Sequence, residues 1–572
     1  MSKLEDLNTS QRQAVQAGDG PLCIIAGPGT GKTKTLTMRI VHLIESKQAQ
    51  PSQVLALTFT KKAAEEMRSR VQAARKGEAP HIATFHALCH ELLGDERPFI
   101  AEPQRLQLVK GLPRPKEFKE LSVRELALAI SVAKNTPEAA DASLAKVVRA
   151  YNKALAGAGM RDFDDLLLDT YQLLQNDEAA RKQVQARYTH VLVDEFQDTN
   201  SLQYRLLKLL LGHSNIFVIG DPNQSIYGFR GASGTIFEQF IDDFAGCRVI
   251  TLTTNYRSVP QVVHLSNALF KDGANLEAQS QTAGLVRAVE VLNEYGEAEW
   301  VLGEIHRAIG GGDLLKAVSD DSRLTHRRLS DFAVLYRSRP AAATFQKLLA
   351  ESGLPYQVVG DGSPYDQPHI QAIITLMRTA LNREPVTLEG YGSAERRLLE
   401  QELSRVNDAL PHALAERLIA VLGFEPTRDL QQFTGVLVRF KDVASAVAYF
   451  DHIAEHGFYD ASADAITLLT IHAAKGLEFS HVFLIGAEEG LLPSARGDAA
   501  EEKRLFYVAV TRARDRLEIT HAKNRGGNKG EPSRFVNGLP PDVLKRHTDP
   551  GIDAQIRRIA KRAAKNSQTS LF

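Results

Sequence analysis

Two short segments constrain the fold of this 572-residue chain more than any other part of its sequence. Residues 26–33 read AGPGTGKT and lie between the apolar run 22–25 and a helix-like stretch that starts at Thr33. Residues 191–198 read VLVDEFQD, an apolar strand that ends in two acidic side chains. A strand that leads through a glycine-rich loop into a helix, beside a second strand that ends in carboxylates, indicates a nucleotide-hydrolysis site on a parallel sheet.

The glycine-rich segment has the composition of a phosphate-binding loop. Its glycines allow successive backbone N–H groups to turn toward an anion, and the N-terminus of the following helix adds a favourable dipole. Lys32 is expected to reach the outer phosphates of ATP, and the hydroxyl of Thr33 is expected to bind Mg²⁺. The predicted nucleotide-binding residues of the loop are Ala26, Gly27, Pro28, Gly29, Thr30, Gly31, Lys32, Thr33 and Lys34. Ala26 replaces the usual first glycine, and a glycine-rich turn without a ligand is the alternative interpretation.

The two acidic residues follow a buried strand, at the place where open α/β sheets bind their ligands. Asp194 is expected to hold Mg²⁺, and Glu195 is expected to orient and deprotonate the attacking water. The alternative is an ordinary pair of surface carboxylates at the end of a strand. Beside a phosphate-binding loop, the pair favours hydrolysis.

Composition argues against several other classes of protein. The chain carries 69 basic and 69 acidic residues, so its net charge gives no support for nucleic-acid binding. The sequence contains neither an apolar run long enough to span a membrane nor the apolar core of a signal peptide at residues 1–11. Its three scattered cysteines match neither a disulfide framework nor a metal motif. These features predict a cytoplasmic protein.

Apolar runs separated by helical patterns predict an α/β fold with two lobes. The strands predicted for the first lobe are 22–26, 54–58, 190–193, 216–219 and 249–252, and those for the second are 288–292, 331–336, 355–359, 466–470, 481–485 and 517–520. The predicted domains are a first lobe (1–93 and 189–253) with a helical insertion (94–188), a second lobe (254–382 and 462–540) with a helical insertion (383–461), and a basic C-terminal tail (541–572).

Further motifs occur in a fixed order along the chain. They are LNTSQ (7–11), LTFTKKAA (57–64), ATFH (83–86), GDPNQSIYGFRGA (220–232), LTTNYRS (252–258), TIHAAKGLEF (470–479) and EEKRLFYVAVTRA (501–513). Together with the loop and the acidic strand, this set closely resembles the superfamily 1 DNA helicases of the UvrD/Rep/PcrA group. The resemblance implies two RecA-like P-loop NTPase lobes, each a parallel sheet flanked by helices, with two mainly helical inserted subdomains.

The resemblance also implies roles for residues around the nucleotide. Gln11 would read the adenine edge, Tyr256 would stack on the adenine face and Glu478 would touch the ribose. Gln224 would sense the γ-phosphate and couple it to DNA. Two arginines, Arg257 and Arg512, would reach the phosphates from the second lobe, so that hydrolysis depends on lobe closure. For either arginine, a surface ion pair is the alternative. The resulting catalytic set is Lys32, Asp194, Glu195, Gln224, Arg257 and Arg512.

A track for single-stranded DNA is implied in the same way, because bases stack on aromatic rings without sequence preference. The DNA-contacting residues at the family's positions are Phe59, Thr60, Lys61, Phe85, His86, Tyr227, Phe229, Arg230 and His472. Phe229 stands where the family often has Trp, and Lys61 replaces a common Asn. For Phe59 and Phe85, which lie at strand ends, a place in the core is the alternative.

Several segments depart from the family's pattern. The second insertion, 383–461, is shorter than in the UvrD/Rep/PcrA enzymes and contains no Gly-Ile-Gly hairpin for gripping duplex. The stretch 360–369 lacks the family's aromatic richness. In the late hairpin, whose tip reads HAKNRGGNKG (521–530), His521 is the only ring where the family places an aromatic pin. Translocation along DNA is therefore better supported than strand separation.

The C-terminal tail has two features of its own. Basic residues outnumber acidic ones between Lys545 and Lys565, which indicates either a phosphate-seeking arm or a solvated helix face. The last five residues, QTSLF, resemble a bacterial sliding-clamp-binding peptide. In such a peptide Gln568, Leu571 and Phe572 would enter an apolar pocket on the clamp.

Three functions are compatible with these observations. The first is an ATP-dependent DNA helicase, a DNA-stimulated ATPase that moves 3′-to-5′ on single-stranded DNA in DNA repair, replication restart or recombination; its polarity is implied only by the resemblance. The second is a single-strand translocase that displaces proteins with little unwinding. The third is a clamp-recruited scaffold with vestigial ATPase activity. The expected cofactors are ATP and Mg²⁺, and the expected partners are single-stranded DNA and its junctions with duplex. The protein is expected to be a monomer or a DNA-induced dimer, associated with the nucleoid.

Overall fold

The chain forms two compact units. In this computed structural model the described residues are 4–136, 142–212, 215–228, 231–232, 234–270, 273, 275–310, 327–359, 365, 367–381, 393–425, 427–456, 459–460 and 463–549. The first unit comprises Met1–Glu290, Ala487–His521 and Gly530–Thr548, and the second comprises the remaining segments. The five-part domain division expected from the sequence, with its boundaries, stays a prediction.

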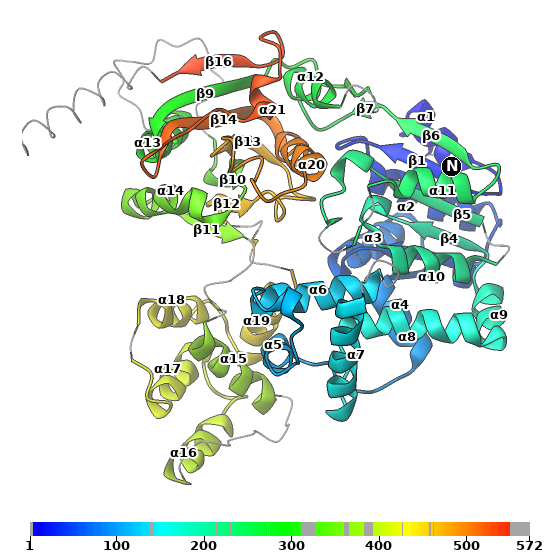
Figure 1. The fold of residues 1–572 in the computed structure, drawn as a ribbon, viewed down its shortest axis with the longest axis horizontal. Helices are drawn as coiled ribbons and strands as arrows, with labels where there is room; N and C mark the ends of the chain where they lie inside the picture. The colour runs from blue at the N-terminus through cyan, green and yellow to red at the C-terminus, as the bar shows by residue number, and fades with distance from the viewer. Residues whose placement is uncertain are drawn as a thin grey trace, which may run out of the picture. The chain divides into compact units, whose positions relative to one another are not determined.

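A six-stranded parallel sheet forms the centre of the first unit, in the order β3-β2-β4-β5-β1-β6 (Figure 1). Its strands are β1 (Leu22–Ala26), β2 (Val54–Thr58), β3 (His81–Thr84), β4 (His190–Val193), β5 (Asn215–Gly220) and β6 (Arg248–Leu252). The five strands predicted for this lobe are confirmed, and β3 is an additional strand that the sequence analysis did not predict. Parallel order and helical connections agree with the predicted α/β class.

Helices cover both faces of this sheet, which explains why its strands read as nearly continuous apolar runs. One face packs against α1 (Thr9–Gln16), α2 (Lys32–Glu45) and α3 (Lys61–Ala74). The other face packs against α4 (Phe85–Leu93), α8 (Phe163–Asn176), α9 (Glu178–Arg187), α10 (Ser201–Leu211) and α11 (Ile236–Asp243). The carboxyl ends of the strands therefore stay open for ligands.

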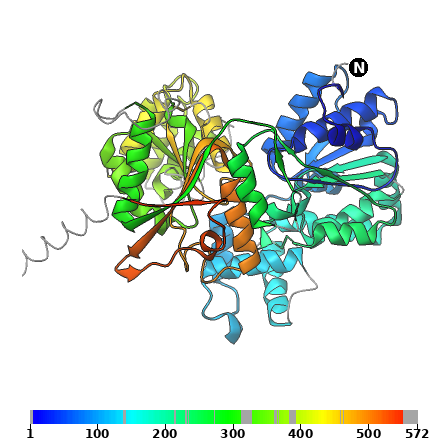
Figure 2. The same ribbon diagram turned by 90° about the horizontal axis from the view of Figure 1, so that it is seen from above.

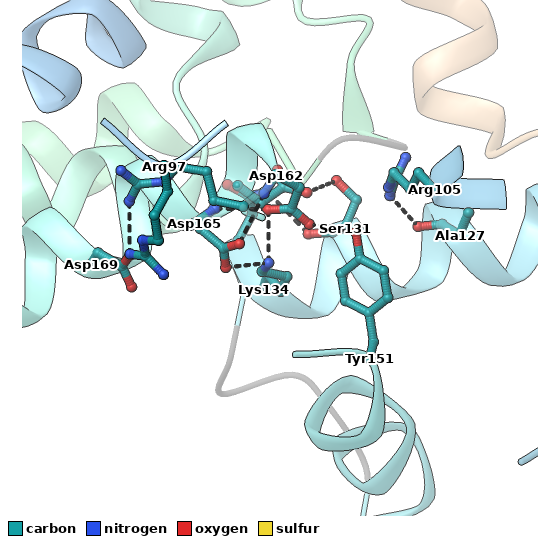
Figure 3. A network of polar contacts seen from close by, with 12 residues as sticks. Arg97, Arg105, Ala127, Ser131, Lys134, Tyr151, Asp162, Asp165 and Asp169 are labelled. Carbon is teal, nitrogen blue, oxygen red and sulfur yellow. Dashed lines mark hydrogen bonds and ion pairs between the residues drawn. The ribbon is translucent and has the colours of Figure 1, made fainter. Parts of the chain in front are cut away.

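The first insertion is helical, as predicted, and a network of charged side chains crosses its interior (Figure 3). Its further helices are α5 (Glu102–Lys110), α6 (Val123–Asn135) and α7 (Ala142–Gly157). The fully buried Lys134 of α6 places Nζ 2.8 Å from Oδ1 of Asp162 and 2.5 Å from Oδ1 of Asp165. The hydroxyl of Tyr151 donates to Asp162 Oδ2 at 2.9 Å. Because each helix supplies a member, the network fixes α6 and α7 against the start of α8.

Asp162 has a second task in this network, because its side chain caps the N-terminus of α8 by accepting from the backbone N–H of Asp165 at 2.9 Å. Burial opposes ionisation of Asp162, but the charge of Lys134 and the hydrogen bonds that the carboxylate accepts together outweigh burial and lower its pKa. Burial instead raises the pKa of Asp165. The next residue of α6, Asn135, connects this helix to α10, which packs on the sheet. Nδ2 of Asn200, the N-cap of α10, donates to Oδ1 of Asn135 at 3.0 Å.

Segments from the later part of the chain complete the first unit. They include β7 (Thr254–Asn255), α12 (Pro260–Leu269), β8 (Glu277–Ala278), α20 (Ala499–Val510), α21 (Arg534–Asn537) and β16 (Lys545–Thr548), together with β9 (Leu285–Asn293) up to Glu290 and β14 (Ala513–Arg525) up to His521. Helices α12 and α20, green and orange in Figure 2, pack side by side. Strand β16 pairs in parallel with β9, so Lys545 and Arg546 lie in a sheet. For these two residues the helix face expected from the sequence is wrong, and binding to phosphate stays a prediction.

The second unit contains the neighbouring parallel strands β11-β12-β10-β13. Their bounds are β10 (Phe332–Tyr336), β11 (Tyr356–Val359), β12 (Ile466–Thr470) and β13 (Phe479–Leu484), and they pack with α13 (Glu294–Ala308) and α14 (Arg339–Ser352). The strands predicted at these places are confirmed. Strand β14 continues into a hairpin with β15 (Asn528–Lys529), whose turn is Gly526–Gly527, so the predicted late hairpin is present.

The second insertion is also helical, and like the first it has an apolar core. Its helices are α16 (Ser393–Leu403), α17 (Pro411–Val421), α18 (Arg428–Leu437) and α19 (Val443–His456), and α15 (Pro368–Leu381), which precedes the predicted start at residue 383, packs with them. Leu414, Phe433 and Phe450 are among the buried side chains that form one core between these helices. Within the described parts of the chain, no helix is both long and apolar enough to cross a bilayer.

Candidate functional site

The phosphate-binding loop adopts the strand–loop–helix geometry that the sequence predicts. It follows β1, and α2 begins at Lys32 with Gly31 as its N-cap in the left-handed region at φ 82°. Gly29 also has a positive φ of 71°, and a Cβ there would stand 2.6 Å from Cβ of Arg257, so only glycine fits. Ala26 is fully buried at the end of β1, which explains why a methyl group is accepted at this position. Lys32 Nζ donates to the carbonyl of Ala26 at 3.2 Å, a bond that a phosphate can replace.

The residues expected around adenine lie beside this loop. Gln11 is buried, and its Nε2 donates to the carbonyl of Thr30 at 2.9 Å while its Oε1 accepts from the backbone N–H of Asn8. It therefore braces the loop, and its contact with adenine stays a prediction. The ring of Tyr256 is 49% exposed, and its hydroxyl accepts from Nδ2 of Asn8 at 2.9 Å. Its backbone N–H donates to the carbonyl of Gly29 at 2.8 Å, so an accessible ring is fixed next to the loop.

The two carboxylates lie at the end of β4, at the open edge of the sheet. Asp194 is only 7% exposed, and burial, with the neighbouring charge of Glu195 as the second cause, raises its pKa to about 7. A cation would stabilise its charged form, and carboxylate and hydroxyl oxygens are the donors that Mg²⁺ prefers. Among the described residues no three His, Cys, Asp or Glu side chains lie together as a metal site, and Mg²⁺ binding by Asp194 and Thr33 stays a prediction.

Glu195 has a strained backbone, which marks it as unusual. Its φ of 46° places a non-glycine residue in the left-handed region, and such outliers cluster at functional sites. Its Oε2 accepts a short hydrogen bond from Nε2 of Gln197. Oε1 of Gln197 accepts from the backbone N–H of Asp221 at 2.9 Å, so one amide orients the expected base against the next loop.

That next loop, which follows β5, contains the expected γ-phosphate sensor. Nε2 of Gln224 donates to Asp221 Oδ2 at 2.8 Å, and its Oε1 accepts from Nη2 of Arg512 at 3.2 Å. Arg512 is 1% exposed, and burial, reinforced by the charge of Arg257, lowers its pKa to about 9. The guanidinium therefore stays charged at neutral pH at a cost that an anionic phosphate would offset. The structure thus brings both arginines and Gln224 together in the first unit.

The aromatic residues expected to contact DNA fall into two groups and one exception. The rings of Phe59 and Tyr227 are half-buried and stack on each other, with centroids 5.4 Å apart and planes 16° apart. Thr60, which caps α3, and Lys61 follow this pair. Phe85 is 5% exposed inside the core, so the alternative of a core position describes it better.

His86 belongs to the second aromatic group, which includes a ring that the sequence analysis missed. Phe163 is 60% exposed, stacks on Phe99 with centroids 4.7 Å apart, and meets His86 edge-on at 6.3 Å. Sequence reasoning counted Phe163 with its helical insertion. The available signal was its position directly after the capping Asp162, at the first residue of a helix.

The remaining expected residues lie in the second unit or outside the described residues, and their roles stay predictions. His472 and Glu478 belong to the second unit, where the first is half-buried and the second exposed. Phe229, Arg230 and the clamp residues Gln568, Leu571 and Phe572 lie outside the described residues, as does most of the stretch 360–369.

Comparison with known proteins agrees with this geometry. The UvrD/REP helicase N-terminal domain matches residues 7–245, and the UvrD-like helicase C-terminal domain matches residues 250–421 and 452–524. The "ATP-dependent DNA helicase PcrA" of Bacillus subtilis is 30% identical, over 95% of this chain and 87% of its own length. The "ATP-dependent DNA helicase UvrD1" of Mycobacterium tuberculosis is 31% identical, over 96% of this chain and 87% of its own length. These matches extend over most of the chain, with about 30% identity to both relatives. The chain therefore belongs to the UvrD/Rep/PcrA group of superfamily 1 helicases.

Proposed function

We propose that this protein is an ATP-dependent DNA helicase that moves 3′-to-5′ along single-stranded DNA in repair, replication restart or recombination. One observation carries the proposal. The backbone N–H of Asp194 donates to the carbonyl of Leu57 at 2.9 Å, and Phe59, two residues further, stacks on Tyr227. The expected metal carboxylate and an aromatic pair suited to bases thus share one edge of the sheet.

Hydrolysis would use the residues of the first unit in the following roles. Loop amides and Lys32 bind the phosphates, with Thr33 and Asp194 as Mg²⁺ ligands. Bound Mg²⁺ supplies charge neutralisation on the β- and γ-phosphate oxygens. Glu195 orients the attacking water and takes its proton. The buried charge of Arg512 faces the phosphate end of Gln224 and stabilises charge that develops in the transition state.

DNA contact would use two groups of rings, of which Phe163 is exposed and the others are half-buried. Phe59 and Tyr227 form one stacking platform, and Phe163 beside His86 forms another. Because stacking reads no sequence, these rings suit a motor that moves along any strand. We include Phe163 among the proposed DNA-contacting residues, and Phe85 is left out because its ring is buried.

The direct test measures ATP turnover with and without single-stranded DNA, together with unwinding of duplexes that carry a 3′ or a 5′ tail. DNA should stimulate turnover, and only the 3′-tailed duplex should be unwound. Lys32→Ala should lower turnover by about 10²–10³-fold, the size typical for losing one transition-state contact. Unwinding that survives in Lys32→Ala would refute the site, and unwinding from a 5′ tail would refute the polarity.

A second function, translocation with little unwinding, is favoured by the late hairpin. Its turn is Gly526–Gly527, and the strands β14 and β15 beside it carry no Phe, Tyr or Trp between 513 and 529. Removal of streptavidin from a biotinylated strand, measured beside fork unwinding, separates the two functions. Displacement without unwinding would support the translocase.

We further propose recruitment by a bacterial sliding clamp through the C-terminal QTSLF, in a nucleoid-associated, cytoplasmic protein that works as a monomer or a DNA-induced dimer. The Leu-Phe pair and Gln568 match what an apolar clamp pocket accepts. Deleting residues 568–572 should abolish clamp pull-down and leave DNA-stimulated ATPase intact. Pull-down that persists after the deletion would refute clamp binding.

A further inference from the structure

Helix α20 lies along the turn that follows the γ-phosphate sensor. Side chains three residues apart on a helix share one face, and three such residues of α20 meet this turn. Tyr507 donates to Asp221 Oδ2 at 3.5 Å, and Nε of Arg504 donates to the carbonyl of Ser225 at 2.6 Å. Glu501 accepts from the backbone N–H of Gly228, where a Cβ would stand 2.5 Å from its Oε2. One helix face thus contacts both ends of the segment 221–228.

The turn itself joins the two functional groups described above. Gln224, which is bonded to Arg512, stands at its nucleotide end, and Tyr227, stacked on Phe59, stands at its aromatic end. The two residues between them, Ser225 and Ile226, are buried. Oγ of Ser225 also donates to the carbonyl of Gln197 at 3.1 Å. A segment so short and so enclosed moves as one body, because a packed interior leaves no room for local slack.

The contacts of Glu501 and Arg504 are made to main-chain groups. Charged side chains form stronger hydrogen bonds than neutral ones, and here a guanidinium satisfies one carbonyl of the turn while a carboxylate satisfies one amide. Burial raises the pKa of Glu501, so the carboxylate is held at a cost to the fold. A purely apolar contact would fill the same space without fixing the register of the backbone.

We infer that Glu501 and Arg504 are positioning residues that hold the turn 225–228 in register and so couple the phosphate contact of Gln224 to the base contact of Tyr227. The inference rests on the proposed function, since it requires both contacts. It adds a task for α20 that is separate from supplying Arg512: the helix carries the nucleotide state to the aromatic pair.

The test compares ATP turnover with and without an oligo-dT strand for the full-length wild type, Glu501→Gln, Arg504→Gln and Arg504→Lys. The ratio of the two rates should fall about tenfold in both Gln variants, the size of one charge-assisted hydrogen bond. Arg504→Lys should recover part of the ratio. Lys503→Gln is the matched control, because Lys503 lies on the same helix over the ring of Phe270 and should keep the wild-type ratio.

Two further readouts separate positioning from a general structural role. Melting temperature and the affinity for fluorescent oligo-dT should stay close to wild type in Glu501→Gln and Arg504→Gln. A wild-type ratio in both variants would overturn the inference, and so would a low ratio that is accompanied by loss of stability or of DNA affinity. A wild type that DNA does not stimulate would instead refute the proposed function.

Discussion

Both helical insertions have an apolar core, but the first also contains a network of buried charged side chains. In the first, Lys134, Tyr151, Asp162 and Asp165 form a buried network in which each polar group has a named partner. In the second, side chains such as Leu414 and Phe433 form an ordinary apolar core. Apolar cores accept many arrangements of similar volume, whereas a buried charge tolerates only geometries that keep it paired.

This difference between the insertions indicates where the orientation of a side chain matters for function. Asp162 caps α8 directly before the exposed Phe163, so the network that holds the first insertion also fixes the direction of a proposed DNA-contacting ring. None of the residues predicted to bind nucleotide or DNA lies in the second insertion. We expect the first insertion to be fixed in its geometry and the second to tolerate repacking.

The largest effect should come from Lys134→Ala. Removing the buried cation leaves two carboxylates close together without compensation, and breaking such a pair costs about 3–5 kcal/mol. Denaturant titration followed by hydrogen exchange in α6 and α8 measures the loss. Lys182→Ala, which removes an exposed pair with Glu178, is the matched control and should change stability by less than about 1 kcal/mol. Equal effects of the two variants would contradict a structural role for the network.

A somewhat smaller loss is expected from Leu414→Ala in the second insertion. The cavity should cost about 2–5 kcal/mol, measured by hydrogen exchange in α16–α18. Leu414→Met, which keeps the volume, should cost less than about 1.5 kcal/mol. If the Met variant is as unstable as the Ala variant, the core is more specific than its composition indicates.

Lowering the pH should have a smaller effect, a loss of stability in helices α4 and α8. Burial lowers the pKa of His86 on α4, and the charge of Asp164 on α8 offsets this only in part. The unfolded state therefore binds the proton first, so the stability contributed by neutral His86 is present above pH ~6.5 and is lost as pH falls below it. Hydrogen-exchange protection of α4 and α8, corrected for intrinsic rates, should fall between about pH 7.5 and 5.5. His86→Gln should reduce this pH dependence, and an unchanged pH profile would argue against the assignment.

The smallest effect concerns a thiol beneath the first insertion. Cys89 of α4 is buried against α8, and burial raises its pKa to about 12. In a background with Cys23→Ala and Cys247→Ser, Cys89 should react with a thiol reagent far more slowly than in the unfolded chain, because the thiolate is the reactive form. Adding Lys134→Ala should speed the reaction. A rate that is insensitive to Lys134 would show that the network does not secure the contact between α4 and α8.

The sequence was a good guide to strands and to the nucleotide loop, because both depend on local patterns. Strand β1 runs over the predicted 22–26, since a strand buried on both faces must be apolar along its length. Phe59 and Phe85 could not be distinguished in this way. Each follows a strand, but Phe85 begins a helix that turns its ring into the core, whereas Phe59 leaves its strand toward Tyr227.

Contacts between distant segments were beyond prediction for the same reason. Glu501 and Arg504 read as an ordinary charged face at the start of a helix, and nothing local indicates that they meet Gly228 and Ser225. Phe163 lies at the first position of its helix, and this position alone does not show that its ring is 60% exposed. Patterns specify which face is apolar; they do not specify what covers it.

The stacked pair of Phe59 and Tyr227 has a consequence for how tightly the protein can hold each base. The two rings stack on each other. An incoming base must therefore replace an aromatic contact worth about 0.5–1.5 kcal/mol to gain a base-stacking contact worth about 1–3 kcal/mol. The net free energy gained for each bound base is therefore small, and a base stacked on these rings dissociates readily. Weak and readily reversible stacking suits a motor that has to release every nucleotide it has just bound.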